Sequence, residues 1–251
     1  MNRTATVIRT ALVGLLWLPL VAIAGLKEDM IALDRAYIPA LAVTSQGTLE
    51  ESQRAMALLN KQWAEFKQKH TGSLPKDKQW KSDLAKIDGM VAEANKIVAS
   101  GKDLAKAHEA LEGLRFTMAD ARKRAKMSYF LDGLTHFHEP MEAIVLTAKD
   151  KTPANFDDAE MKLIADALVE AEKLWGVVRK TKIDAEYGFS DAQRETLAKL
   201  IANESQALET LKKALAANDK AAVIKAAGAI KPPFAKTFMS FGNFEPVRQQ
   251  H

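Results

Sequence analysis

The residues best suited to chemistry lie close together at positions 136–142, in the run His-Phe-His-Glu-Pro-Met-Glu. On a helix, His138, Met141 and Glu142 stand at i, i+3 and i+4 and share a face, while His136 lies on a neighbouring one. Imidazole, thioether and carboxylate groups together suit copper or iron, and helix bundles hold such sites in their interiors. The pattern therefore predicts a metal site with these candidate ligands: His136, His138, Met141 and Glu142.

No second set of ligands stands out elsewhere in the sequence. His70 is expected in a loop and His108 on a polar face, and His251 is the last residue. Glu204 lies in an apolar seam, where we expect its stem to pack while its carboxylate reaches solvent. The alternative to a metal site is that the histidines beside Pro140 are half-exposed polar residues without a ligand. We therefore expect no resident cofactor and keep copper, iron or haem as the alternative.

The sequence lacks the motifs of common enzyme classes. It has no GxSxG, no HExxH, no glycine-rich phosphate loop and no nucleophile paired with a plausible base. It also has no cysteine, which excludes disulfides, thiolate metal sites and covalent haem attachment through CxxCH. We therefore expect a protein that is not an enzyme.

The N-terminus has the features of a secretory signal. Residues 1–10 carry two arginines and no acid, and the apolar run at 11–24 ends in Ala22-Ile23-Ala24. The run is too short to span a bilayer comfortably, and charged residues follow at once. We expect a signal peptide at 1–24, cleavage before Gly25 and a periplasmic mature protein. The alternative is an uncleaved N-terminal anchor.

The charges give no indication of a nucleic-acid or membrane partner. The formal net charge is +4, and acidic and basic residues are interleaved along the chain. Such interleaving is typical of solvated helix faces. It favours neither nucleic acid nor a membrane surface as a partner once the signal is cleaved.

From Leu26 onward the sequence is rich in helix formers, and its apolar residues recur at heptad spacing. The first half predicts helices with these limits: about 26–43, from Thr48 to a break at 71–75, a third that stops at Ser100-Gly101, and a fourth that begins with Asp103 as its cap. The third is the clearest, because its apolar residues alternate steps of four and three: Trp80, Leu84, Ile87, Val91, Ala94 and Val98.

The second half begins at Tyr129, after a basic stretch at 122–126 that we expect to be a solvated hinge. A polar loop at 150–157, a linker at 181–189 and a turn at 218–219 separate its four predicted helices.

The last two predicted helices carry recognisable start and break signals. Ser190 and Gln193 have the spacing of a capping box. Pro232-Pro233 must kink or divide the final helix, because two prolines remove two backbone donors. The apolar segment that follows, to Phe244, either caps the core or docks a partner.

The two halves are similar to each other. Trp63 and Trp175 occupy equivalent places, and residues 107–122 are similar to 222–239. Tryptophan at a heptad position is more often core than the wall of a ligand pocket, although both remain open. The sequence thus predicts an all-α fold of two tandem up-and-down four-helix bundles from an internal duplication. The predicted units are 25–128 and 129–241, followed by an irregular C-terminal tail at 242–251.

The third and fourth predicted helices of each half, residues 83–115 and 195–231, resemble the matching half of periplasmic four-helix bundles of the cytochrome c′ and cytochrome b562 type. The likeness lies in a pattern of alanine, lysine and leucine with a polar turn. It implies the bundle fold, and it implies a homodimer as a further expectation, because cytochromes c′ commonly dimerise.

The same resemblance argues against covalent haem. In cytochromes c′ a glycine precedes the haem-binding CxxCH on the last helix. Setting Gly113 and Gly228 on that glycine places these residues where two cysteines and a histidine would be: Arg115, Met118 and Ala119 in one half, and Lys231, Phe234 and Ala235 in the other. The positions that match the iron-ligating histidine of cytochrome b562 hold Arg122 and Phe238, which cannot ligate haem.

We therefore expect a non-enzymatic periplasmic binding or scaffold protein, whose partner is a periplasmic protein or a small ligand. The alternative is a protein that handles copper or iron, or that binds haem without a covalent link. The two interpretations differ in whether the face of the helix that carries His138 points into the protein or out to water.

Overall fold

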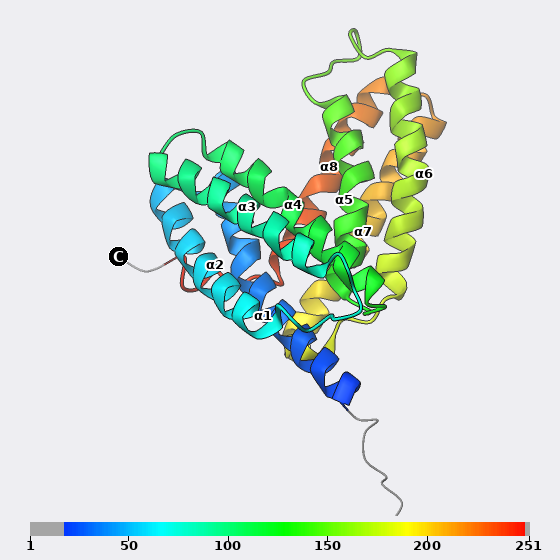
Figure 1. Cartoon of the computed structure of the whole chain (residues 1–251). Helices are drawn as coiled ribbons and strands as arrows, with labels where there is room; N and C mark the ends of the chain where they lie inside the picture. The colour runs from blue at the N-terminus through cyan, green and yellow to red at the C-terminus, as the bar shows by residue number, and fades with distance from the viewer. Residues whose placement is uncertain (1–17, 249–251) are drawn as a thin grey trace, which may run out of the picture.

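The computed structural model describes residues 18–248, with side chains from Gly25 onward. Within that range the chain is all-α, with one short 3-10 helix and no strand (Figure 1). The helices are α1 Leu18–Gln46, α2 Leu49–His70, α3 Trp80–Ser100, α4 Leu104–Arg124, α5 Phe130–Ala148, α6 Asp158–Lys180, η1 Ala185–Tyr187, α7 Asp191–Ala216 and α8 Lys220–Met239. The signal peptide predicted at 1–24 falls mostly outside the described residues, and so does His251.

The helices pack in two groups of four (Figure 1). In the first group α1 contacts α2 and α4, and α3 lies between α2 and α4. In the second group α5 contacts α6 and α8, and α7 lies between α6 and α8. Turns of two or three residues join α1 to α2, α3 to α4 and α7 to α8, so the helices of these pairs run antiparallel. The groups meet where α4 contacts α5 and where α1 contacts α8 and η1.

Local capping signals set several helix ends, as predicted. Ser190 and Gln193 form a capping box at α7, and Gly101 ends α3 in a left-handed conformation with φ 67°. The prediction for Asp103 was wrong in part. It precedes α4, but its own φ is 53° and its side chain accepts no hydrogen bond from the backbone N–H groups of the helix. The carboxylate instead pairs with Lys106 at 2.8 Å.

The buried hydrophobic side chains form one continuous cluster that runs through both groups of helices. All six predicted core residues of α3 are buried in it. The two equivalent tryptophans are also core residues rather than pocket walls. Trp63 donates its indole N–H to Asp88 on the next helix at 2.8 Å, and Trp175 donates to Ser205 on the next helix at 3.0 Å. Each indole N–H is therefore satisfied by a side chain of the following helix.

The two prolines do not divide α8, which runs unbroken from Lys220 to Met239. The carbonyl groups that lose their N–H donors belong to Gly228 and Ala229, four residues before each proline. Both of these residues are exposed, so water can solvate the freed carbonyls. This explains why a pair of prolines is compatible with a continuous helix here.

The prediction that Glu204 reaches solvent was wrong. Its side chain is 0% exposed on α7, and neither carboxylate oxygen has a hydrogen-bond partner among the described residues. Burial raises the pKa of this carboxyl from its ordinary value of 4.5 to about 8. The group is therefore mostly protonated at neutral pH, because the neutral form costs less to bury.

The basic stretch at 122–126 is not simply a solvated hinge, because Arg122 is 2% exposed. Its Nε and Nη2 atoms donate to Asp132 of α5 at 2.9 and 2.5 Å, and its guanidinium lies 4.1 Å above the ring of Tyr129. The hydroxyl of Tyr129 in turn donates to Asp34 of α1. This buried set of side chains, which we call the junction network, fixes the two groups of helices to each other.

The C-terminal tail has the irregular backbone that was predicted over its described part, 242–248, but it packs against the protein instead of extending away from it. Val247 is fully buried, and the backbone N–H of Asn243 donates to the carbonyl of Arg35 at 2.9 Å. Arg54 of α2 donates from Nε to the carbonyl of Val247 at 2.9 Å. The end of the second group thus packs back onto the first, and Phe241 just before it stacks on Phe130 with ring centroids 5.3 Å apart.

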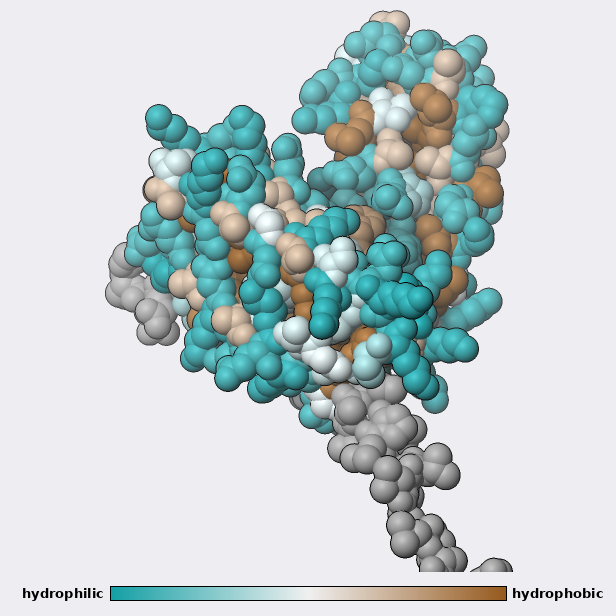
Figure 2. All heavy atoms as spheres, in the orientation of Figure 1, coloured by the Kyte–Doolittle hydropathy of each residue, from teal (hydrophilic) through white to brown (hydrophobic). Residues whose placement is uncertain are grey.

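Most of the face drawn in Figure 2 is hydrophilic, with scattered apolar residues. The large exposed hydrophobic residues are Leu49, Leu146, Leu163, Val169 and Val177. None of the helices described between residues 18 and 248 is both long enough and apolar enough to cross a membrane.

Candidate ligand pocket

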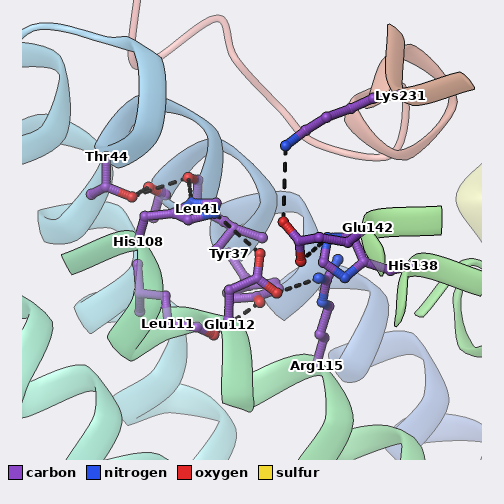
Figure 3. A network of polar contacts seen from close by, with 11 residues as sticks. Tyr37, Leu41, Thr44, His108, Leu111, Glu112, Arg115, His138, Glu142 and Lys231 are labelled. Carbon is purple, nitrogen blue, oxygen red and sulfur yellow. Dashed lines mark hydrogen bonds and ion pairs between the residues drawn. The ribbon is translucent and has the colours of Figure 1, made fainter. Parts of the chain in front are cut away.

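A pocket of about 100 Å³ lies where the two groups of helices meet. Its walls come from α1 and α4 on one side and from α5 and α8 on the other. Apolar walls are provided by Leu41, Phe234 and Phe238, among others. Its ionisable lining residues are His108, Glu112, Arg115, His138, Glu142 and Lys231. Figure 3 shows these side chains converging from different helices.

The charged walls arise from second stripes on α4 and α5. On α4, Glu112, Arg115, Ala119 and Arg122 follow one another at steps of three, four and three, beside the apolar stripe that faces the first group's core. On α5, Leu131, Thr135, His138 and Glu142 follow at steps of four, three and four. Side chains at these steps share one helix face. Each helix therefore has one face for its own group and a more polar face toward the other group.

Arg115 is the most deeply buried charged group of the pocket, with 5% of its side chain exposed. Its Nη2 donates to Glu112, one turn earlier on α4, whereas its Nε is buried with no hydrogen-bond partner. The guanidinium carbon lies 5.5 Å from the ring centroid of Phe238. A buried donor without a partner costs about 1–3 kcal/mol, and more when the group is charged. Such a group is uncommon in folded proteins and needs an explanation.

His108 and Glu112 form a pair beside Arg115. The Nδ1 of His108 donates to the carbonyl of Leu41 at 2.8 Å, and its Nε2 lies 3.1 Å from Glu112. Burial alone would lower the pKa of His108, but its hydrogen bonds to Glu112 and to Leu41 outweigh burial and raise it. Because both ring nitrogens face acceptors, the geometry fits the imidazolium form.

Glu112 is ionised in this setting. Burial alone would raise the pKa of its carboxyl, but the hydrogen bond from His108 and the charge of Arg115 lower it. One carboxylate is thus shared between two cationic neighbours.

His138 has the opposite electrostatic setting. It is 9% exposed, and its Nε2 lies 3.4 Å from Glu142, one turn later on α5. Burial lowers the pKa of His138 to about 4, and the nearby charge of Arg115 adds to the effect. The ring is therefore neutral at neutral pH. The other neighbour of Glu142 is Lys231 of α8, whose Nζ lies 4.0 Å away.

The structure brings together only part of the predicted metal set. His138 and Glu142 line the pocket, but Met141 is fully buried in the hydrophobic core and His136 does not line the pocket. In the portion of the chain that is described, no three His, Cys, Asp or Glu side chains form a group suited to a metal ion. A site made of all four residues stays a prediction, and these positions do not favour it.

Two other histidines differ from their predicted settings. His108 was predicted on a polar face, but it is half-buried and lines the pocket. His70 was predicted in a loop, but it is the last residue of α2, is buried, and places its Nε2 2.7 Å from Asp29. The spacing of His108 and Glu112 at i and i+4 was readable in the sequence. The carbonyl of Leu41, 67 positions away, was not.

The positions that the cytochrome resemblance assigned to haem attachment fall in two places. Arg115, Lys231 and Phe234 line the pocket, whereas Met118 is buried in the core. Comparisons of the chain with models of protein families, with curated proteins and with solved structures find no match. The function of the chain must therefore be argued from its own geometry.

Proposed function

We propose that this protein is a non-enzymatic binding protein that holds a small ligand in the pocket between its two groups of helices. The observation that carries the proposal is Arg115, a charged side chain that is almost fully buried at a cavity and keeps an unpartnered Nε. Proteins seldom bury such a group without a partner. Arg122 also has one unpartnered buried nitrogen, Nη1, but of the two arginines only Arg115 lines the pocket. Apolar walls beside a few converging polar groups are also the usual composition of a small-molecule site.

The proposal includes the origin of the fold and the cellular location. The packing of α1–α4 and α5–α8 in the same pattern supports two tandem up-and-down four-helix bundles from an internal duplication. The equivalent roles of Trp63 and Trp175 support it further. The N-terminal sequence supports export to the periplasm, since it has the charge and length pattern of a secretory signal. In this view the ligand site formed where two duplicated bundles joined.

The face of α5 that carries His138 points into the protein, as the metal or haem alternative requires, but copper, iron and haem are still weaker candidates for the ligand. A metal cation beside His138 would lie near two positive groups, Arg115 and Lys231, which lower the pKa of that histidine. The pocket of about 100 Å³ is only partly open to solvent, so a porphyrin would not fit without movement of its walls. A periplasmic protein or a second copy of the chain would be a further partner. Neither is needed to form the pocket, because this chain alone supplies its lining.

Extraction of small molecules from the purified protein tests the proposal. The untagged protein would be denatured, and the released compounds measured by mass spectrometry beside an Ala235→Phe variant that fills the pocket. Ala235 lines the pocket, whereas Ala229 is exposed on the same helix and gives a matched control, Ala229→Phe. We expect a compound that accompanies the wild-type and control proteins and is depleted in the filled variant. Identical extracts from all three proteins would overturn the proposal.

A further inference from the structure

We infer that the ligand of this pocket is an organic monoanion, with a carboxylate beside Arg115 and Lys231 and an apolar body against Leu41, Phe234 and Phe238. This inference rests on the proposed function, because it names the chemical class of the ligand in the same pocket.

Positive groups outnumber carboxylates in the lining. The cationic groups, with His108 in the imidazolium form that its hydrogen bonds favour, are His108, Arg115 and Lys231. The carboxylates are Glu112 and Glu142. His138 adds no charge at neutral pH, because it is buried beside Arg115. The lining therefore has one net positive charge, and one added negative charge would balance it.

The geometry indicates where that negative charge would lie. Glu112 already occupies one side of the Arg115 guanidinium, and Glu142 lies between His138 and Lys231. A carboxylate that entered the pocket would lie near the guanidinium of Arg115 and the ammonium of Lys231. Charge-assisted hydrogen bonds of this kind are about twice as strong as neutral ones. A neutral ligand would leave the charge unbalanced, and a cation would be repelled.

The apolar walls require more than an inorganic anion. Phe234 and Phe238 stack 6.3 Å apart along α8, and Leu41 faces them across the pocket from α1. Phosphate or chloride would leave these surfaces uncovered, whereas a ring or short alkyl chain would cover them. The pocket of about 100 Å³ is partly open to solvent, so it can hold the head group while the rest of the body lies at its mouth.

Three probes of the same shape isolate the charge: benzoate, benzamide and benzamidine. Isothermal titration calorimetry with the full-length protein at pH 7 measures each dissociation constant. We expect benzoate to bind at least about tenfold more tightly than benzamide, since hydrogen bonds to charged groups are the stronger ones. We expect benzamidine to bind least, and inorganic phosphate to compete poorly with benzoate.

A variant of Lys231 tests the position of the carboxylate. Half of the Lys231 side chain is exposed, so Lys231→Gln should fold normally. We expect it to weaken benzoate binding by about three- to tenfold and to leave benzamide binding unchanged. Lys225 is exposed on the same helix, so Lys225→Gln should change the affinity for neither benzoate nor benzamide.

The outcomes separate this inference from the proposed function. If benzamide or benzamidine bound as tightly as benzoate, the inference would be overturned. The proposal that the pocket binds a small ligand would still stand. If inorganic phosphate bound to the pocket as tightly as benzoate, the requirement for an apolar body would be overturned. Failure of all three probes would also overturn the inference, and the extraction from the Ala235→Phe variant would then decide the proposed function independently.

Discussion

Replacing Glu204 by glutamine should remove a pH dependence from the stability of the protein. The carboxyl is fully buried without a hydrogen-bond partner, and its pKa is raised from 4.5 to about 8. In the unfolded chain the proton leaves near pH 4.5, whereas the folded protein keeps it to about pH 8. Between these values the folded state binds more protons than the unfolded state, so the free energy of unfolding falls as pH rises.

The size of this effect follows from the linkage relation. Within that window each pH unit costs up to about 1.4 kcal/mol. From pH 5 to pH 7 the wild-type protein should therefore lose about 2–3 kcal/mol through Glu204 alone. Glutamine has nearly the same shape and no charge, so the variant should not show this loss. Any fixed cost of burying the amide is the same at each pH and cancels from the comparison.

The measurement is urea unfolding followed by circular dichroism at pH 5, 6 and 7. The wild-type protein, Glu204→Gln and Glu195→Gln would be compared, because Glu195 is exposed on the same helix. We expect the difference in unfolding free energy between Glu204→Gln and wild type to grow by about 2–3 kcal/mol from pH 5 to pH 7. The control should stay parallel to wild type. Parallel curves for Glu204→Gln would refute the argument, since they would mean that this carboxyl has an ordinary pKa.

Two further predictions concern the junction and the pocket. Asp132→Asn should destabilise the protein by about 3–5 kcal/mol in urea unfolding, because it leaves the buried Arg122 without its ion-pair partner. A loss of stability below about 1 kcal/mol, which is typical of an exposed pair, would contradict the buried pairing. In an NMR titration the His138 ring should stay neutral until about pH 4, since burial and Arg115 disfavour the imidazolium. Saturating benzoate should raise that midpoint, and an unchanged midpoint would place the bound carboxylate away from His138.

The helices of this protein could be predicted from sequence because their signals are local. The core face of α3 depends only on steps of three and four along one helix, and all six of its predicted residues are buried. The capping box at Ser190 needs only Gln193, three residues later. Likewise, the all-helical class follows from composition and periodicity. Such features do not depend on how distant parts of the chain pack.

The settings of the charged residues could not be predicted in the same way. Arg122 was assigned to a solvated hinge and His108 to a polar face, because polar residues usually lie at the surface. Arg122 is buried where α4 meets α5 of the other group, whereas His108 binds the carbonyl of Leu41 on α1 of its own group. Glu204 was misassigned for a related reason, since heptad spacing placed it in the seam but could not show that its head group is enclosed. Local spacing identifies a face, whereas tertiary packing decides whether water reaches it.

This difference explains why the candidate site lies at the join between the groups. Inside each group the facing residues are mostly apolar, with Glu204 an exception, so a cavity there would have few polar groups to select a ligand. At the join, the second faces of α4 and α5 bring charged residues against each other, and imperfect pairing leaves Arg115 with an unpartnered Nε. The junction network of Asp34, Tyr129, Arg122 and Asp132 holds the same two helices one to two turns from the pocket. The position of the groups relative to each other therefore sets both the stability of the join and the spacing of the charges that would select a ligand.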